Sequence, residues 1–578
     1  MLYLVHENSW DMRCILLNTL FFCKSSKDLE MGMVEWDGEN RFFRGYPWVV
    51  YGLYAFLFIL LSFLFSCAHG RGGGLQEWED SSTRLLRLSL LDNGLSVGDS
   101  ILSVSEDLSA FYLKRGDRLA WCGPRGPGLQ ADALYAVIKE AGEDGLDPRL
   151  YHVATIGKLL ERWRRPSDKP PSLRAAVQLD LLLTNAFILY GNHMLRGRID
   201  PRAVHDFWEA TFMQGGIPDL LETALDLQQV RMTLENLRPP QIGYVRLKNA
   251  LARYRAVQRQ GGWNQVSAEG EGLRERLEMS GDWVDTEHRT SLRRFQRRRH
   301  LEPTGRLDRV TLEALKEPVE AQIAQIELNM ERWRWLPHDS EARYILVRLD
   351  DYELDFIDRG QLQFTLRIIV GKSFWRTPIF SSTMTHLVVN PYWYVPRSIA
   401  AEEILPILQR DPGYALRNGL RISKGEGMEV KRLDPDSIDW NGMDPAIFDL
   451  HIAQIPGGTN PLGVVKFYFK NPYHIYLHDT PNKALFELEK REFSHGCIRV
   501  EHSELLAQRI LSDWGKEALS NLIKSGRNRQ IGFDDPLPVF LLYWTAWVDE
   551  EGQLYLHDDA YQSDEKMLQA LGKTLYNN

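Results

Sequence analysis

The stretch HDTPNKALFELEKREFSHGCIRV, residues His478–Val500, decides how this chain is interpreted. It places Cys497 within Ser-His-Gly-Cys, directly before an apolar residue and Arg499. A cysteine nucleophile needs a lowered pKa or a neighbouring base, because the thiolate is the reactive species. His495 lies two positions before Cys497, and His478 lies nineteen before it, at the end of a predicted strand. Either histidine could serve as the base.

Two neighbours of the thiol fit a reactive site. Gly496 permits a tight turn that can direct consecutive N–H groups at one point, as a tetrahedral oxyanion requires. Arg499 shares a strand face with Cys497 and could orient a substrate carboxylate. By residue type alone, two other interpretations stay open: a buried structural cysteine, and a zinc site formed by His474, His478 and Cys497.

The sequence around this stretch predicts strands. From Arg343 to Lys372, apolar and polar residues alternate, with turns at Asp350-Asp351 and Arg359-Gly360. We predict a catalytic domain over residues 341–525, with a helical lid insertion over about 398–458 and a C-terminal segment, 526–578, packed on its neighbours. A long insertion between strands often covers a functional site.

The preceding sequence predicts helices. Apolar residues recur at helical spacing over 75–262, which indicates a helical scaffold domain. Residues 268–318 form a short unit with two helical runs around the turn LEPTGRLD. Its run Arg297-Arg298-Arg299 is expected to be a solvated helix face. The amphipathic pattern over residues 319–340 predicts a linking helix.

Composition limits the class of protein. The 578 residues predict several domains, and a net charge of −9 argues against a nucleic-acid-binding protein. The five cysteines include no CxxC pair, which argues against a zinc ribbon or a thioredoxin-like site. Beyond residue 67 only Cys122 and Cys497 remain, so a disulfide between them stays open.

The N-terminal region is predicted to carry an export signal or anchor, with a buried core helix as the less favoured alternative. Pro47–Ser66 is 20 residues long without a charge, which is enough for a transmembrane helix. The segment also fits a signal peptide, and the residues ending in Cys67 resemble a lipobox. Residues 1–46 form an extension whose true start could be Met31 or Met33. The anchor, the lipoprotein and the cleaved signal peptide each predict a periplasmic or cell-envelope protein.

The motif resembles the signature of the YkuD-type L,D-transpeptidases: a histidine, fifteen residues, then Ser-His-Gly-Cys, an apolar residue and arginine. The similarity extends to the large subgroup with a helical scaffold and an inserted three-helix peptidoglycan-binding unit. It covers nearly the whole chain from about Leu108, through the segments ERWRWLP, NPYWYVPRSIAAEEILP, NPLGVVKFYFKN and VFLLYWTAWVDEEG. It implies an α+β multidomain chain whose catalytic domain is a YkuD-like β-sandwich.

The resemblance also implies an activity. Such enzymes join peptidoglycan tetrapeptide stems by 3→3 cross-links between diaminopimelate residues, through a cysteinyl thioester and with release of D-Ala. Carried over to this chain, the nucleophile is Cys497, the base is His478, the oxyanion turn is formed by His495 and Gly496, and the groove residues are Tyr476, Ser494, Arg499 and Trp393. The N–H groups of Gly496 and Cys497 are the implied oxyanion donors.

The partners implied are donor and acceptor stems, the membrane through the apolar segment, and other cell-wall enzymes, with no metal or cofactor. Carbapenems are the implied inhibitors. Two other functions stay open: a carboxypeptidase or endopeptidase on the same fold, and a non-catalytic wall-binding protein.

Overall fold

The computed structural model describes residues 75–572, except 92–94, 98–99, 103, 166–170, 210–215, 285–287, 340, 426–429 and 513. The apolar segment Pro47–Ser66, Cys67 and the extension 1–46 lie outside these residues, and so do Met31 and Met33. The predictions for them therefore stay predictions.

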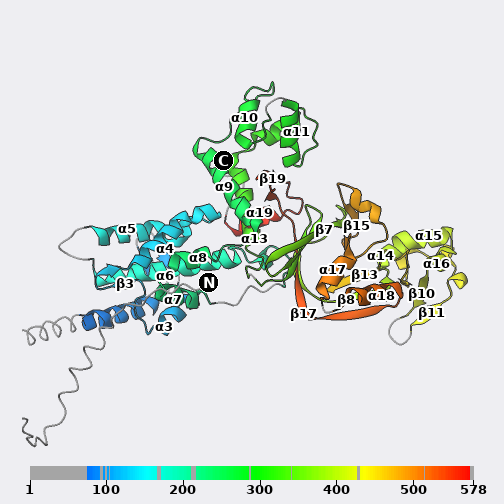
Figure 1. The fold of residues 1–578 in the computed structure, drawn as a ribbon, viewed down its shortest axis with the longest axis horizontal. Helices are drawn as coiled ribbons and strands as arrows, with labels where there is room; N and C mark the ends of the chain where they lie inside the picture. The colour runs from blue at the N-terminus through cyan, green and yellow to red at the C-terminus, as the bar shows by residue number, and fades with distance from the viewer. Residues whose placement is uncertain are drawn as a thin grey trace, which may run out of the picture. The chain divides into compact units, whose positions relative to one another are not determined.

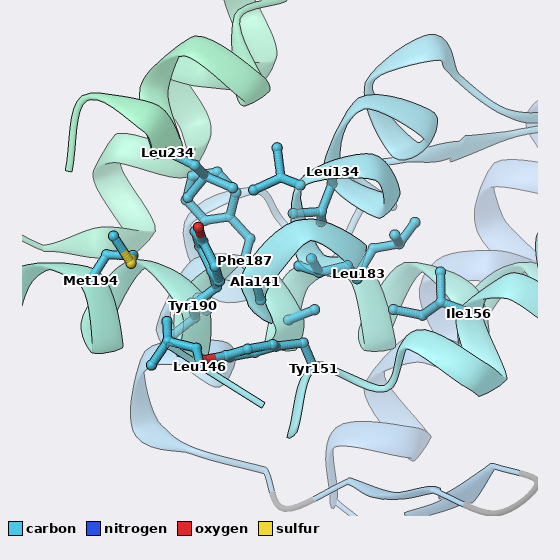
Figure 2. Close-up of a cluster of buried hydrophobic side chains, with 14 of the residues drawn as sticks. Leu134, Ala141, Leu146, Tyr151, Ile156, Leu183, Phe187, Tyr190, Met194 and Leu234 are labelled. Carbon is cyan, nitrogen blue, oxygen red and sulfur yellow. The ribbon is translucent and has the colours of Figure 1, made fainter. Parts of the chain in front are cut away.

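The scaffold domain is a set of helices around a central apolar helix, α6. Ser172 caps the start of α6 by accepting from Ala175 N–H, and Gly197 follows its end. Among the described residues α6 is the one helix long and apolar enough to cross a membrane, but 78% of its apolar stretch is buried inside the domain. Leu183, Phe187 and Tyr190 of α6 pack in this core (Figure 2). The scaffold elements are a helix over 75–91, β1 (Leu95–Val97), β2 (Ser100–Leu102), α3 (Glu106–Lys114), β3 (Cys122–Gly123), β4 (Gly126–Pro127), α4 (Leu129–Lys139), α5 (Val153–Arg164), α6 (Leu173–Arg196), α7 (Ile217–Asp226), α8 (Val230–Glu235) and α9 (Ile242–Arg259).

The small unit predicted over 268–318 has its own core and three helices, α10 (Leu273–Ser280), α11 (His288–Arg298) and α12 (Arg309–Lys316). Gln296 stabilises the predicted turn, since its side-chain oxygen accepts from Gly305 N–H and its amide donates to Thr311. The expectation of a solvated arginine run is wrong for two of its members. Arg298 is buried and pairs with the fully buried Asp282 at 2.5 Å, and Arg299 pairs with Glu317 at 2.6 Å.

Helix α13 (Val319–Trp333) belongs to two cores at once. Its Val319, Ile326 and Met330 pack in the scaffold core, whereas Leu328 packs in the core of the β domain. The charged residues at its end are buried and paired: Glu331 accepts from Ile199 N–H at 2.8 Å and pairs with Arg334 at 2.9 Å. Buried charges without such partners would be strongly destabilising. This pairing explains why ERWRWLP combines charge with tryptophan.

The predicted catalytic domain is built on a nine-stranded mixed sheet in the order β15-β7-β16-β14-β13-β8-β17-β5-β6. Strand β7 pairs with β6 along its first part and with β16 at Ile368 and Ile369, so the sheet closes on itself around one apolar core. This mostly β domain confirms the predicted fold class. Its strands and helices are β5 (Tyr344–Arg348), β6 (Glu353–Asp358), β7 (Gln361–Gly371), β8 (Phe380–Val389), β13 (Val465–Phe469), β14 (Leu477–His478), β15 (Glu492–Ser494), β16 (Ile498–Val500), α17 (Ser503–Ile510), α18 (Lys516–Lys524) and β17 (Arg529–Leu542).

The C-terminal segment differs from the prediction in one respect. Strand β17 does not pack on the domain from outside; it lies inside the sheet, antiparallel to β8 and parallel to β5. A sequence pattern cannot show this, because the pairing is set by contacts with strands about 140 to 194 positions earlier. The rest of the segment forms β18 (Ala546–Val548), β19 (Leu554–Leu556) and α19 (Ser563–Ala570), and β18 contacts α9 and α13.

The lid is a subdomain with its own sheet and core. Its four strands are ordered β11-β10-β12-β9, and the apolar core includes Leu405, Ile422 and Trp440. It starts at β9, a few residues before the predicted boundary, and ends with β12. Figure 1 shows α16 beside β10 in this part. The elements are β9 (Trp393–Tyr394), α14 (Arg397–Ile399), the π-helix η4 (Ala400–Ile404), α15 (Leu405–Arg410), α16 (Tyr414–Arg417), β10 (Leu420–Lys424), β11 (Lys431–Leu433) and β12 (Leu450–Gln454).

Candidate functional site

Strand alternation places the chemical groups on one face of the sheet. In the parallel pair β14–β16, Leu477 lies opposite Ile498, and His478 lies opposite Arg499. Leu477 and Ile498 are fully buried in the apolar core. Because successive side chains of a strand point to opposite faces, His478 and Arg499 lie on the other face.

A cavity of ≈ 320 Å³ opens on this face, between the sheet and the lid. Seven of the eight site residues expected from sequence line it; the eighth, Gly496, lies in the turn that presents the thiol. Those seven are Cys497, His478, His495, Tyr476, Ser494, Arg499 and Trp393, and the lid adds Glu402 and Glu403. The structure therefore brings residues from three sheet segments and the lid to one place.

Cys497 is a neutral thiol in this arrangement. Burial raises its pKa, while the N–H and O–H of Tyr476, Lys466 and Arg499 oppose that shift. Its Sγ–H donates to the backbone carbonyl of His474 at 3.8 Å, a contact that only the protonated form can make. Cys122 is a separate, buried free cysteine in the scaffold, so the two thiols form no disulfide.

His478 is arranged as a neutral base. Its Nδ1–H donates to the carbonyl of Asp479, which can only accept, so the tautomer leaves Nε2 as a proton acceptor. Burial and the Arg499 charge lower the pKa of His478 to about 3. His478 is only 4% exposed. The carboxylate of the next residue, Asp479, accepts from Val464 N–H at 2.9 Å. At neutral pH this pair is therefore thiol and imidazole, and not thiolate and imidazolium.

The turn before the thiol requires glycine. Gly496 has φ +109°, and a Cβ there would lie 2.9 Å from Ile475 Cδ1. Its carbonyl accepts from the hydroxyl of the fully buried Thr377 at 2.8 Å, and the same hydroxyl accepts from Gly371 N–H at 3.0 Å. Two consecutive anchors thus fix the loop that carries Cys497.

Ser494 closes the same turn from the other side. Its hydroxyl donates to the Cys497 carbonyl at 2.5 Å and accepts from Gly496 N–H at 3.1 Å. The sequence predicts the Gly496 N–H to be an oxyanion donor. In this arrangement it donates instead to the Ser494 hydroxyl. The Cys497 N–H as oxyanion donor stays a prediction.

His495 connects the motif with the lid. Its Nε2 lies 2.7 Å from Glu403 Oε1 of the π-helix η4, within ion-pair distance. Its ring packs on Trp375 with the ring centroids 4.5 Å apart. π-Helical turns often occur at functional sites, and this one brings a carboxylate to the mouth of the cavity.

Thr377, Glu403 and Lys466 were missed from sequence. Nothing in the spacing of Thr377 or Glu403 distinguishes them, since each reaches the motif from more than 90 positions away. Lys466 carries a signal: in Val-Lys-Phe-Tyr-Phe it lies on the face opposite the apolar core. Within the described part of the chain no three His, Cys, Asp or Glu side chains are grouped as metal ligands.

Comparison with known proteins agrees with this architecture. The model of the L,D-transpeptidase catalytic domain, YkuD, matches residues 342–513, and that of the Scaffold domain matches residues 106–251. A curated Haemophilus influenzae protein named "Putative L,D-transpeptidase" is 34% identical over 251 residues, which is 43% of this chain and 50% of that protein. The chain thus spans about half the length of that relative.

Two solved structures are also similar. An L,D-transpeptidase from Mycobacterium smegmatis is 11% identical, with a TM-score of 0.17, over 35% of this chain and 58% of the other. The structure entitled "Structure of the Ldtfm-avibactam carbamoyl enzyme" is 12% identical, with a TM-score of 0.15, over 35% and 49%. Likenesses of this size define no site residue.

Proposed function

We propose that this protein cross-links peptidoglycan stems, because residues 342–513 match the model of the L,D-transpeptidase catalytic domain and residues 106–251 match that of the Scaffold domain. The proposed reaction joins two diaminopimelate residues by a 3→3 bond and releases D-Ala. One observation carries the proposal: a neutral thiol and a neutral imidazole with an acceptor Nε2 line one lid-covered cavity.

In the first half-reaction Cys497 Sγ attacks the carbonyl carbon between diaminopimelate and D-Ala. His478 Nε2 takes the thiol proton as the C–S bond forms, and returns it to the leaving nitrogen as the C–N bond breaks. The low pKa of His478 disfavours a long-lived imidazolium, so the proton passes promptly to D-Ala. The product is a neutral thioester on Cys497, and the thiol proton has passed to the released D-Ala.

In the second half-reaction the side-chain amine of another stem attacks the thioester. A C–N bond forms, the C–S bond breaks, and one amine proton returns to the sulfur through His478. No metal or cofactor is needed, since the amide bond broken in the donor stem and the amide bond formed in the cross-link differ little in energy. We propose that the lid favours the amine over water by excluding solvent from the cavity.

The proposed location is the periplasm or cell envelope, with attachment through Pro47–Ser66 or a lipid on Cys67, where the polymer and other cell-wall enzymes would be partners. Carbapenems are the proposed inhibitors, because a strained β-lactam carbonyl can acylate the same thiol. The small three-helix unit is a proposed contact for the glycan polymer.

The test incubates the purified full-length protein and a Cys497→Ala variant with disaccharide-tetrapeptide, followed by mass spectrometry of the products. We expect a cross-linked dimer and free D-Ala from the wild type, and neither from the variant. Tripeptide without dimer would instead identify a carboxypeptidase. No product from either protein would refute both enzymatic functions and favour a wall-binding role.

A further inference from the structure

Three basic side chains occupy one row of the catalytic sheet. Lys466 of β13 is the register partner of His478 of β14, which in turn is the partner of Arg499 of β16. Directly paired residues on adjacent strands project from the same face, so Lys466, His478 and Arg499 form a continuous row beside Cys497. We call these three residues the basic row.

Lys466 has no ion-pair partner among the described residues. No carboxylate lies within ion-pair distance of Lys466 or Arg499 there, and Arg499 Nε is buried without a hydrogen-bond acceptor. Lys466 is half-buried, and its Nζ lies 3.5 Å from the ring centroid of Tyr476, within cation–π distance. A partly desolvated cation without a carboxylate is costly, which is not expected of a residue that only fills space.

Tyr476 connects Lys466 with the reacting atom. Its backbone N–H and its hydroxyl both interact with Cys497 Sγ, and its ring packs edge-on to His478 with centroids 5.8 Å apart. A cation on the ring face draws electron density from the phenol, which makes the hydroxyl a stronger hydrogen-bond donor. A stronger donor stabilises negative charge on the sulfur.

We propose that Lys466 is a positioning residue for catalysis, which stabilises the Cys497 thiolate through Tyr476 and by its own charge. It does not line the cavity, so it acts on the reaction without touching the substrate. The inference rests on the proposed function only in taking Cys497 as the nucleophile.

The charges around Lys466 agree with this role. The groups that face it are His386 of β8, Tyr476 and His478 at β14, and Cys497 and Arg499 at β16. Lys466 and Arg499 both lower the pKa of His478 and oppose the upward shift of the Cys497 pKa. The row therefore keeps the base neutral while it favours the charged form of the nucleophile.

The test measures the pH dependence of Cys497 alkylation by iodoacetamide in the full-length protein. Trypsin releases Cys497 in the peptide Glu492–Arg499, which separates it from the other four cysteines. We expect Lys466→Met to move the alkylation midpoint upward by about half to one pH unit, so that the rate at pH 7 falls roughly three- to tenfold. Lys466→Arg keeps the charge and is expected to restore the wild-type midpoint.

Lys470→Met is the matched control, because Lys470 is exposed four positions further along the chain. A wild-type midpoint in Lys466→Met would overturn the proposal. Equal displacement in Lys466→Arg, or in Lys470→Met, would also overturn it, since the charge at position 466 would then not be the cause. The alkylation midpoint does not depend on the amount of folded protein. The comparison of midpoints stays decisive even if the wild type makes no cross-links.

Discussion

Replacing Thr377 by valine tests whether buried hydrogen bonds hold the nucleophile loop. The Thr377 hydroxyl accepts from Gly371 N–H at 3.0 Å and donates to the Gly496 carbonyl at 2.8 Å, and the side chain is fully buried. Valine keeps the shape but leaves both backbone groups unsatisfied. Each buried orphan costs ~1–3 kcal/mol, so the catalytic domain should lose ~2–6 kcal/mol of unfolding free energy.

The same change should slow the reaction. The Gly496 carbonyl is one anchor of the turn that carries Cys497, and a displacement of the nucleophile near 1 Å costs roughly 100-fold in rate. We expect acylation of Cys497 by a carbapenem, followed by intact mass, to fall at least about tenfold in Thr377→Val. Thr377→Ser keeps the hydroxyl and should stay near wild type in both assays. Wild-type stability and acylation in the valine variant would refute the reasoning.

Three further changes address the turn, the lid and one buried histidine. Gly496→Ala forces a residue with a side chain to adopt φ +109°, a strain of ~1–3 kcal/mol. It should slow Cys497 acylation while the scaffold keeps its helical circular dichroism. An unchanged acylation rate would contradict the role of the turn. Glu403→Gln weakens the lid contact with His495, so the tripeptide share of the products should rise about twofold or more. The unfolding midpoint should stay constant, since exposed ion pairs add little stability. Burial lowers the pKa of His205 to about 3, below its unfolded value of about 6.5, so its stabilising effect is complete above pH 6.5 and is lost as the pH falls toward 3. His205→Phe removes this titration and should lose less thermal stability than the wild type between pH 6.5 and pH 4; equal losses would exclude the histidine as a cause.

The local elements of this chain were predictable because their signals are local. The helices of the scaffold follow from apolar spacing, and the turn at Gly305 follows from glycine and a capping aspartate at Asp308. The position of His478 at a strand end follows from the alternation that precedes it. The grouping of His478 with Cys497 depended on the motif, since by residue type both His478 and His495 were candidates for the base.

Long-range partners were not predictable from the pattern. Strand β17 joins the sheet through contacts with β5 and β8, and Thr377 reaches Gly496 across 119 positions. The burial of Arg298 depends on Asp282 and on the Leu554 carbonyl, a group 256 positions away. A run of arginines looks solvated because sequence spacing does not show which of its members meets a buried acid.

The most direct test of the central claim is the site of the covalent intermediate. The full-length protein is mixed with disaccharide-tetrapeptide, quenched in acid within the first turnover and digested for peptide mass analysis. We predict a disaccharide-tripeptide adduct on the peptide Glu492–Arg499, lost in Cys497→Ala and strongly reduced in His478→Gln. Turnover to product with this peptide unmodified, or an adduct that persists in Cys497→Ala, would contradict the assignment of Cys497 as the nucleophile.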